Sequence, residues 1–135
     1  MDKAVWSGTY EEEFATELVR RVVNGDVCFD VGGYRGFFAG VMALAGAARV
    51  VVFEPLPANQ AAISRLCQLN PALPIELKEF ALGRADGSLK FTVMCDPSMG
   101  KLESSTFQPE ASSASQIEVA VRSIDSIVAS GDTPV

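Results

Sequence analysis

The sequence contains no histidine, so the side chain that most often serves as a general base near neutral pH is missing. Any base in this chain must therefore be another residue type. Cysteine is also scarce. Cys28, Cys67 and Cys95 stand far apart, and three isolated positions form neither a disulfide framework nor a zinc motif. We expect no metal site, and we interpret Cys28 as a small buried apolar residue in a strand.

Long apolar runs and clustered basic residues are missing as well. The longest apolar run is far shorter than the ~18 residues that indicate a membrane span. The chain opens with Met1-Asp2-Lys3 rather than with a signal peptide. A nucleic-acid binder usually carries a basic stripe, whereas here the net charge is -6 and only Arg20 and Arg21 are adjacent. These absences predict a cytoplasmic protein whose partners are neither nucleic acid nor membrane.

The chain does have enough apolar material for one folded domain, since 48% of its 135 residues are hydrophobic. Its first part predicts a helix, because Phe14, Leu18 and Val22 recur at helical spacing behind an acidic run. A polar turn ends this helix before the first strand. We therefore divide the chain into an N-terminal helical leader at 1–24 and a domain at 25–135.

The middle of the chain alternates strands and helices. The segments 27–29, 49–53 and 75–82 are predicted strands, and helical patterns at 37–48 and 57–70 separate them. Strands that alternate with helices indicate a parallel sheet with flanking helices. The order βαβαβ therefore predicts an α/β fold of the Rossmann-like kind.

The last third of the chain has a different pattern. Apolar and polar side chains alternate at 89–94 and again at 117–124, which predicts two strands that pair as an antiparallel ribbon. The stretch between them, 96–115, is rich in Ser, Pro and Gly and reads as a loop. A short helix is expected from residue 125 onward.

The stretch 27–38 carries the main motif, Val-Cys-Phe-Asp-Val-Gly-Gly-Tyr-Arg-Gly-Phe-Phe. A strand ends at Asp30, a turn with Gly32, Gly33 and Gly36 follows, and a helix begins. Such a turn lets a ligand approach the backbone and points helix N–H groups at it. The glycines do not match the dinucleotide fingerprint, Gly-x-Gly-x-x-Gly. The pattern acid-x-Gly-x-x-x-Gly is similar instead to motif I of S-adenosylmethionine-dependent methyltransferases with a Rossmann-like fold.

A second anchor is Glu54, which follows the predicted second strand and precedes Pro55. In Rossmann-like folds an acid at this place accepts hydrogen bonds from both ribose hydroxyls. A carboxylate suits that task because it offers two acceptor oxygens to a vicinal diol. We therefore predict that Glu54 binds the ribose of a nucleoside.

Several segments together resemble the opening of the FkbM family of methyltransferases, over roughly residues 24–128. They stand in the family's order and spacing: Gly25 to Gly36; Val52 to Pro55 with Pro57, Asn59 and Asn70 behind; Ala81 to Gly83 with Asp86 and Gly87; Ser104 and Ser105; and Ile117 to Asp125. The resemblance implies a Rossmann-like class I methyltransferase fold and S-adenosylmethionine as cofactor. It also implies O-methylation of a hydroxyl on a small molecule or glycan.

The resemblance further implies roles for individual residues. The turn would hold the methionine end and part of the ribose, Glu54 with Pro55 would hold the ribose hydroxyls, and backbone groups at Phe80 and Ala81 would line the adenine. The turn residues concerned are Asp30, Gly32, Gly33, Tyr34 and Gly36, and Ser104 and Ser105 would reach the mouth of the site. The family usually has Ala and then Asn where this chain has Gly33 and Tyr34. No catalytic base is assigned.

The family continues beyond the Ser-Ile-Asp segment at 123–125 into a fourth strand, and this chain stops before it. We therefore expect a domain truncated before strand four. Right-handed crossovers place the first strand at a sheet edge, where open apolar backbone favours association. We expect this edge to be covered by further polypeptide, by another chain in a homo-oligomer, or by the segment 117–124.

Two other interpretations stay open. An NAD-dependent oxidoreductase fits Glu54 but not the glycine spacing. A non-catalytic half-Rossmann module, which binds a nucleoside or only a protein partner, fits a chain without the fourth strand.

Overall fold

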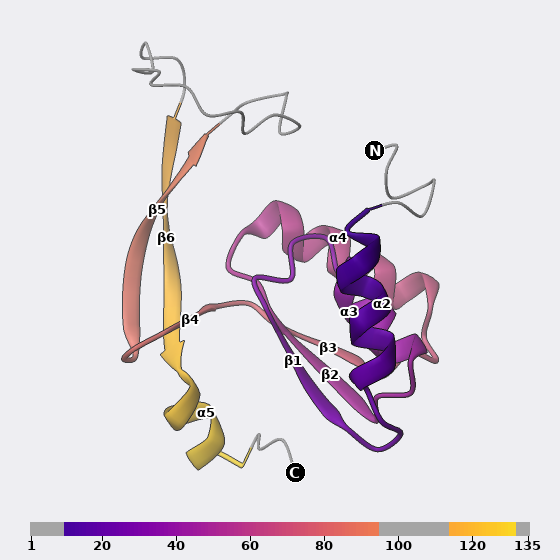
Figure 1. Ribbon diagram of the computed structural model, residues 1–135. Helices are drawn as coiled ribbons and strands as arrows, with labels where there is room; N and C mark the ends of the chain where they lie inside the picture. Colours follow the sequence, from indigo (N-terminus) through magenta and orange to yellow (C-terminus); the bar gives the residue numbers. More distant parts are fainter. Residues whose placement is uncertain (1–9, 95–113, 132–135) are drawn as a thin grey trace.

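The structure is a computed structural model that describes residues 10–94 and 114–131. It contains two three-stranded sheets with helices packed around them (Figure 1). The helices are α2 (Glu12–Arg21), α3 (Phe37–Leu44), α4 (Pro57–Leu69) and α5 (Ile124–Ala129). The strands are β1 (Val27–Val31), β2 (Arg49–Phe53), β3 (Ile75–Lys78), β4 (Ala81–Gly83), β5 (Gly87–Met94) and β6 (Ala114–Ser123).

The first sheet is parallel and has the order β1-β2-β3, as the βαβαβ pattern predicts. Its central strand β2 pairs Val50 with Cys28 on one side and with Ile75 on the other. Four consecutive residues of β2, from Val50 to Phe53, are fully buried. A continuous apolar strand of this kind is stable because both of its faces are covered.

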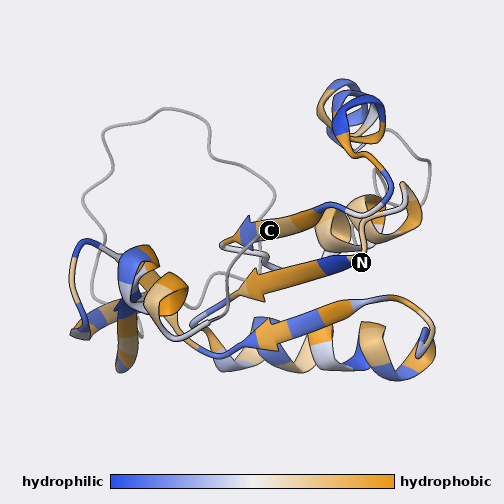
Figure 2. Cartoon of the chain, turned by 90° about the horizontal axis from the view of Figure 1, so that it is seen from below, coloured by the Kyte–Doolittle hydropathy of each residue, from blue (hydrophilic) through white to orange (hydrophobic). Residues whose placement is uncertain are grey.

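Alternate residues of β2 point into two separate apolar cores. Val50 and Val52 pack with α3 and α4, through Met42 and Ile63 among others. Val51 and Phe53 point to the opposite face and pack with Ile127 of α5. The strands of the first sheet accordingly carry long hydrophobic stretches between the flanking elements (Figure 2). The end of β2, with Glu54 next to it, is therefore fixed from both sides.

The second sheet has the order β4-β6-β5, with β5 antiparallel to β6. Leu89 pairs with Val119, and Val119 and Val121 are buried while Glu118 and Ala120 are exposed. The predicted antiparallel ribbon is thus confirmed, and both of its strands begin earlier than expected.

Two predicted boundaries are wrong. The third strand, expected at 75–82, divides into β3 and β4, because β3 pairs with β2 whereas β4 leaves that sheet and pairs in parallel with β6. The helix expected at 37–48 ends at Leu44, since Gly46 adopts a left-handed conformation with φ of 110° that stops the helix.

Short-range polar contacts dock α5 on the second sheet. Asp86, in the turn between β4 and β5, accepts hydrogen bonds from the Ser123 N–H and the Ser126 hydroxyl, both at 2.7 Å. The Ser123 side chain caps α5 by accepting from the Ser126 N–H at 3.1 Å. This capped start directs Ile127 against the first sheet.

Strand β1 is an edge strand in the described part of the chain, because it pairs with β2 alone. Its last residue, Val31, is 58% exposed. The expectation that the segment 117–124 covers this edge is wrong, since β6 pairs with β4 and β5. Within the described ranges no helix is long and apolar enough to cross a bilayer.

An ion-pair cluster between β2 and β3 sets an expected pH dependence of stability. Hydrogen bonds from Lys78 and Arg49 lower the pKa of Glu76 from its ordinary value of 4.5. A lowered folded-state pKa stabilises the fold above the ordinary value, and this contribution is lost as the pH falls through the folded-state pKa. We expect Glu76→Gln to lower the free energy of unfolding at pH 7 by less than about 1 kcal/mol, because the side chain is 41% exposed.

Urea denaturation at a series of pH values from 7 downward checks this expectation, since the wild type loses the Glu76 charge only once the pH falls below the lowered folded-state pKa. The difference between wild type and Glu76→Gln should shrink toward zero in acid. A difference that stays constant with pH would contradict the assignment.

Candidate functional site

The glycine turn after β1 is bound to the end of β2. The N–H groups of Gly32 and Gly33 both donate to the carbonyl of Phe53, at 2.9 and 3.4 Å. Gly32 has φ of 75°, which a residue with a Cβ rarely adopts. The turn therefore closes over the carboxyl end of the sheet, at the edge where Rossmann-like folds place their ligands.

Glu54 is the polar centre of this edge and is only 3% exposed. One carboxylate oxygen accepts the N–H of Tyr34 and the other accepts the N–H of Leu56, each at 2.9 Å. The Glu54 backbone donates to the carbonyl of Lys78 and accepts from the Gln60 side chain. Each carboxylate oxygen carries one hydrogen bond in the structure and retains capacity for another donor.

Asp30 places a second carboxyl group beneath the turn. Burial raises its pKa, the nearby Glu54 charge raises it further, and a hydrogen bond from the Ala39 backbone opposes both. Its Oδ2 atom is buried and has no hydrogen-bond partner among the described residues. A buried acceptor without a donor is uncommon, and it suits a site that receives donors from a ligand or from water.

Gly33 is glycine because of its neighbours and not because of its backbone angles. A Cβ built at this position would lie 2.1 Å from Cγ1 of Val52 and 3.3 Å from Oδ2 of Asp30. The resemblance to the FkbM family has Ala here. In this chain the Val52 side chain occupies the space that an alanine methyl would need.

Gly36 serves the packing of the two helices behind the turn. It precedes α3 with φ of 82°, and a Cβ there would lie 2.9 Å from Cδ2 of Leu66 in α4. The structure therefore groups Asp30, Gly32, Gly33, Tyr34 and Glu54 through hydrogen bonds and close contacts, whereas Gly36 faces α4.

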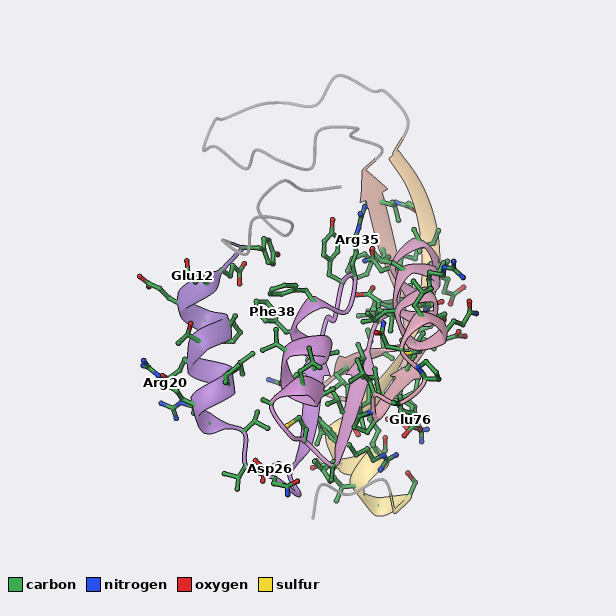
Figure 3. The ribbon with its side chains drawn as sticks, turned by 90° about the vertical axis from the view of Figure 1, so that its right-hand side faces the viewer. Glu12, Arg20, Asp26, Arg35, Phe38 and Glu76 are labelled. Carbon is green, nitrogen blue, oxygen red and sulfur yellow. The ribbon has the colours of Figure 1, made fainter. Side chains whose placement is uncertain are left out.

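Tyr34 and Arg35 project from the turn. Tyr34 has φ of 51°, and its side chain is 41% exposed. The Arg35 guanidinium lies over the Tyr34 ring, with Cζ 5.4 Å from the ring centre. In Figure 3 Arg35 lies toward the upper end of the molecule, whereas the labelled Glu76 lies toward the lower end.

The remaining predicted residues lie around this centre. Pro55 follows Glu54 and is half-buried. Phe80 lies between β3 and β4, where its ring packs 5.7 Å from the Phe53 ring, and Ala81 begins β4 opposite Val121. The backbone contacts to adenine stay a prediction. Ser104 and Ser105 lie outside the described residues.

Sequence reasoning missed two residues that shape the site. Gln60 donates its side-chain amide to the Glu54 carbonyl, and Val52 fills the space above Gly33. Gln60 lies one helical turn into α4 from the strand end, a position from which a side chain reaches back to the preceding loop. This spacing is visible in the sequence and could have predicted the hydrogen bond of Gln60. The contact of Val52 depends on how β1 and β2 are aligned, which the sequence does not state.

Comparisons with known proteins show which solved structures this chain resembles. No protein-family model matches the sequence, and no curated protein matches it significantly. Among solved structures, the chain is similar to the FkbM methyltransferase from Methylobacillus flagellatus KT. The two share 17% identity, the match covers 88% of this chain and 30% of that chain, and the TM-score is 0.51.

Two other methyltransferase structures match with lower TM-scores. The ribosomal protein L11 methylase from Lactobacillus delbrueckii subsp. bulgaricus has 22% identity, with 54% of this chain and 38% of that chain covered and a TM-score of 0.47. PRMT6-SAH has 22% identity, with 59% and 25% covered and a TM-score of 0.46. This chain thus spans well under half the length of the three solved structures.

The likeness to the FkbM methyltransferase concerns the fold. The parallel β1-β2-β3 sheet, its helices and the antiparallel ribbon form a Rossmann-like class I methyltransferase fold, as the sequence predicts.

The contact between Gly33 and Val52 predicts a compensating pair of substitutions. Gly33→Ala should lower the free energy of unfolding by about 1–3 kcal/mol, because the new methyl group overpacks the turn. Val52→Ala alone should also destabilise by roughly 1.5–3 kcal/mol, through lost burial. The double variant should be more stable than the sum of the two predicts, by about 0.5 kcal/mol or more.

Chemical denaturation of the four proteins forms a double-mutant cycle. If the two effects simply add, Val52 does not occupy the space that the Gly33 position needs, and the explanation for glycine at this site fails.

Proposed function

We propose that this chain is the cofactor-binding part of an S-adenosylmethionine-dependent methyltransferase. The observation that carries the proposal is the carboxyl edge of the first sheet. There a glycine turn and a buried acid at the end of β2 are held together by the hydrogen bond from Tyr34 to Glu54. The fold and the motif resemblance support the same assignment.

The residues present fit such a cofactor. Glu54 retains acceptor capacity for ribose hydroxyls, and Oδ2 of Asp30 is a buried acceptor that receives no hydrogen bond from residues 10–94 or 114–131. Gly32, where a Cβ would meet nothing within 4 Å, leaves the backbone open to a ligand. In the proposed arrangement the turn holds the methionine end, Glu54 beside Pro55 holds the ribose, and the backbone at Phe80 and Ala81 lines the adenine.

The bound cofactor would supply an activated methyl group, and the chain would supply alignment. Asp30, Glu54 and the turn would fix the orientation of the donor. Since the given sequence has no histidine, a base supplied by this chain would have to be another residue type, and we assign none. A hydroxyl on a small molecule or glycan is our proposal for the acceptor, and it rests on the motif resemblance alone.

The edge strand β1 has one side without a neighbouring strand among the described residues. We propose that another strand pairs with β1, supplied either by further polypeptide or by a second copy of the chain. An apolar strand end such as Val31, which is 58% exposed, is stabilised by such pairing.

Calorimetric titration with S-adenosylhomocysteine, the product form of the cofactor, tests the proposal directly. We expect the folded chain to bind S-adenosylhomocysteine and not NAD. The reason is that the turn lacks the dinucleotide glycine spacing, whereas Glu54 suits the ribose diol of either compound.

The opposite preference, NAD bound and S-adenosylhomocysteine ignored, would favour an oxidoreductase. A sample that is folded by circular dichroism and binds neither compound would refute the cofactor site in this chain and favour a non-catalytic module.

Glu54 should be required for binding. Glu54→Gln keeps the shape of the side chain but removes its charge and turns a donor toward a backbone N–H. We expect binding of S-adenosylhomocysteine to weaken by about 1–3 kcal/mol, the usual cost of losing hydrogen bonds to a charged group. Stability should fall as well, because one of the two N–H groups, that of Tyr34 or that of Leu56, loses its acceptor.

The matched control is Glu12→Gln, an exposed acid of α2 that Figure 3 shows far from Arg35 and the turn. Its affinity should equal that of the wild type. Unchanged affinity in Glu54→Gln, measured on protein shown to be folded, would remove Glu54 from the ribose site.

A further inference from the structure

The turn contains one non-glycine residue in a conformation that disfavours it. Tyr34 has φ of 51°, in the left-handed region that Gly and Asn tolerate better than an aromatic residue. Strain of this kind persists only where the surroundings enforce it, and it gathers at functional sites. Its N–H is fixed by the buried Glu54 carboxylate at 2.9 Å, which holds the backbone in place.

The Tyr34 side chain belongs to neither apolar core among the described residues. It is 41% exposed, and the ring contact described for it is with Arg35, whose Cζ lies 5.4 Å from the ring centre. A guanidinium over a tyrosine face is attracted by the electrons of the ring and is restrained in direction. The ring therefore limits where the exposed Arg35 side chain points.

Arg35 has no carboxylate partner within residues 10–94 and 114–131. By contrast, Arg21, Arg49 and Arg122 each have an acidic neighbour within 4 Å. Arg35 is thus a cation presented at the carboxyl edge, on the turn itself, with its charge unpaired among the described side chains. A planar guanidinium is well suited to bind a carboxylate through two hydrogen bonds.

The acidic groups near the turn would repel an anionic part of a ligand unless a positive charge lay beside them. Asp30 and Glu54 place two acidic groups at this edge, and they attract hydroxyl and ammonium donors but repel a carboxylate. The proposed cofactor carries one anionic group, the carboxylate of its amino-acid part. A ligand with that group at the methionine end requires a compensating positive charge.

We propose that Arg35, braced on the ring of Tyr34, binds the carboxylate of the amino-acid part of the cofactor. The inference rests on the proposed function and adds to it a residue for the one anionic group of the ligand. Arg35 is the binding residue, and Tyr34 is a positioning residue that acts through it.

Two ligands separate this role from the others in the site. S-adenosylhomocysteine has the amino-acid carboxylate, whereas 5′-methylthioadenosine has the same nucleoside and sulfur without it. We expect Arg35→Gln to weaken S-adenosylhomocysteine binding about tenfold or more and to leave 5′-methylthioadenosine binding unchanged. The affinity of Arg35→Lys for S-adenosylhomocysteine should lie between those of the wild type and Arg35→Gln, since lysine keeps the charge but lacks the planar guanidinium.

Arg20→Gln is the matched control for loss of one positive charge, because Arg20 is an exposed residue of α2 on the far side of the molecule from Arg35 (Figure 3). It should bind both ligands as the wild type does. An Arg35→Gln protein that binds S-adenosylhomocysteine as the wild type does would overturn the assignment. An equal loss for both ligands would also overturn it, since that result indicates a distorted turn. A wild-type chain that binds neither ligand would refute the proposed function itself.

Substitutions of Tyr34 test whether its ring orients the Arg35 side chain. Tyr34→Asn relieves the strained backbone and removes the ring, so the melting temperature should rise while S-adenosylhomocysteine binds more weakly. Tyr34→Phe keeps the ring and should weaken binding less than Tyr34→Asn does. A residue with only a structural role would change stability and affinity in the same direction. Wild-type affinity in Tyr34→Asn would refute the positioning role.

Discussion

The hydrogen bonds of the buried Glu54 carboxylate determine the shape of the candidate site. One oxygen holds the N–H of Tyr34 in the turn after β1, and the other holds the N–H of Leu56 at the start of α4. A carboxylate with 3% exposure is stable only when its charge is hydrogen-bonded. The same group therefore joins two adjacent strand ends and sets the distance between the turn and the helix that follows β2.

Close packing and backbone strain explain how this turn departs from the sequences that it resembles. Val52 fills the space in front of Gly33, so the alanine methyl that the family usually has there would not fit without a shift. Tyr34 adopts a conformation that asparagine tolerates more easily, and its ring supports Arg35 instead of filling the core. The side chains that this turn presents to a ligand therefore differ from those usual in the family at positions 33 and 34.

The remainder of the fold supports this edge from two directions. Val50 and Val52 pack on α3 and α4, and Phe53 packs on Ile127 of α5 from the opposite face. The second sheet positions α5, because Asp86 binds the first residues of that helix. A segment distant in sequence therefore stabilises the strand that ends at Glu54, which links the ribbon to the site that we propose.

Much of this arrangement follows from local patterns. The apolar runs at 27–29 and 49–53, with helical spacing between them, indicate adjacent parallel strands, and the acids at Asp30 and Glu54 then fall at one edge. The division of the third strand into β3 and β4 was not visible, because no glycine or proline interrupts residues 75–82 and only pairing with β6 separates the two strands. Tertiary structure likewise decides three contacts that the sequence does not show. These are the contact of Val52 with Gly33, the two hydrogen bonds to Glu54 and the stacking of Arg35 on Tyr34. Periodicity determines which face of an element is apolar, whereas strand register and burial decide which atoms meet across two elements.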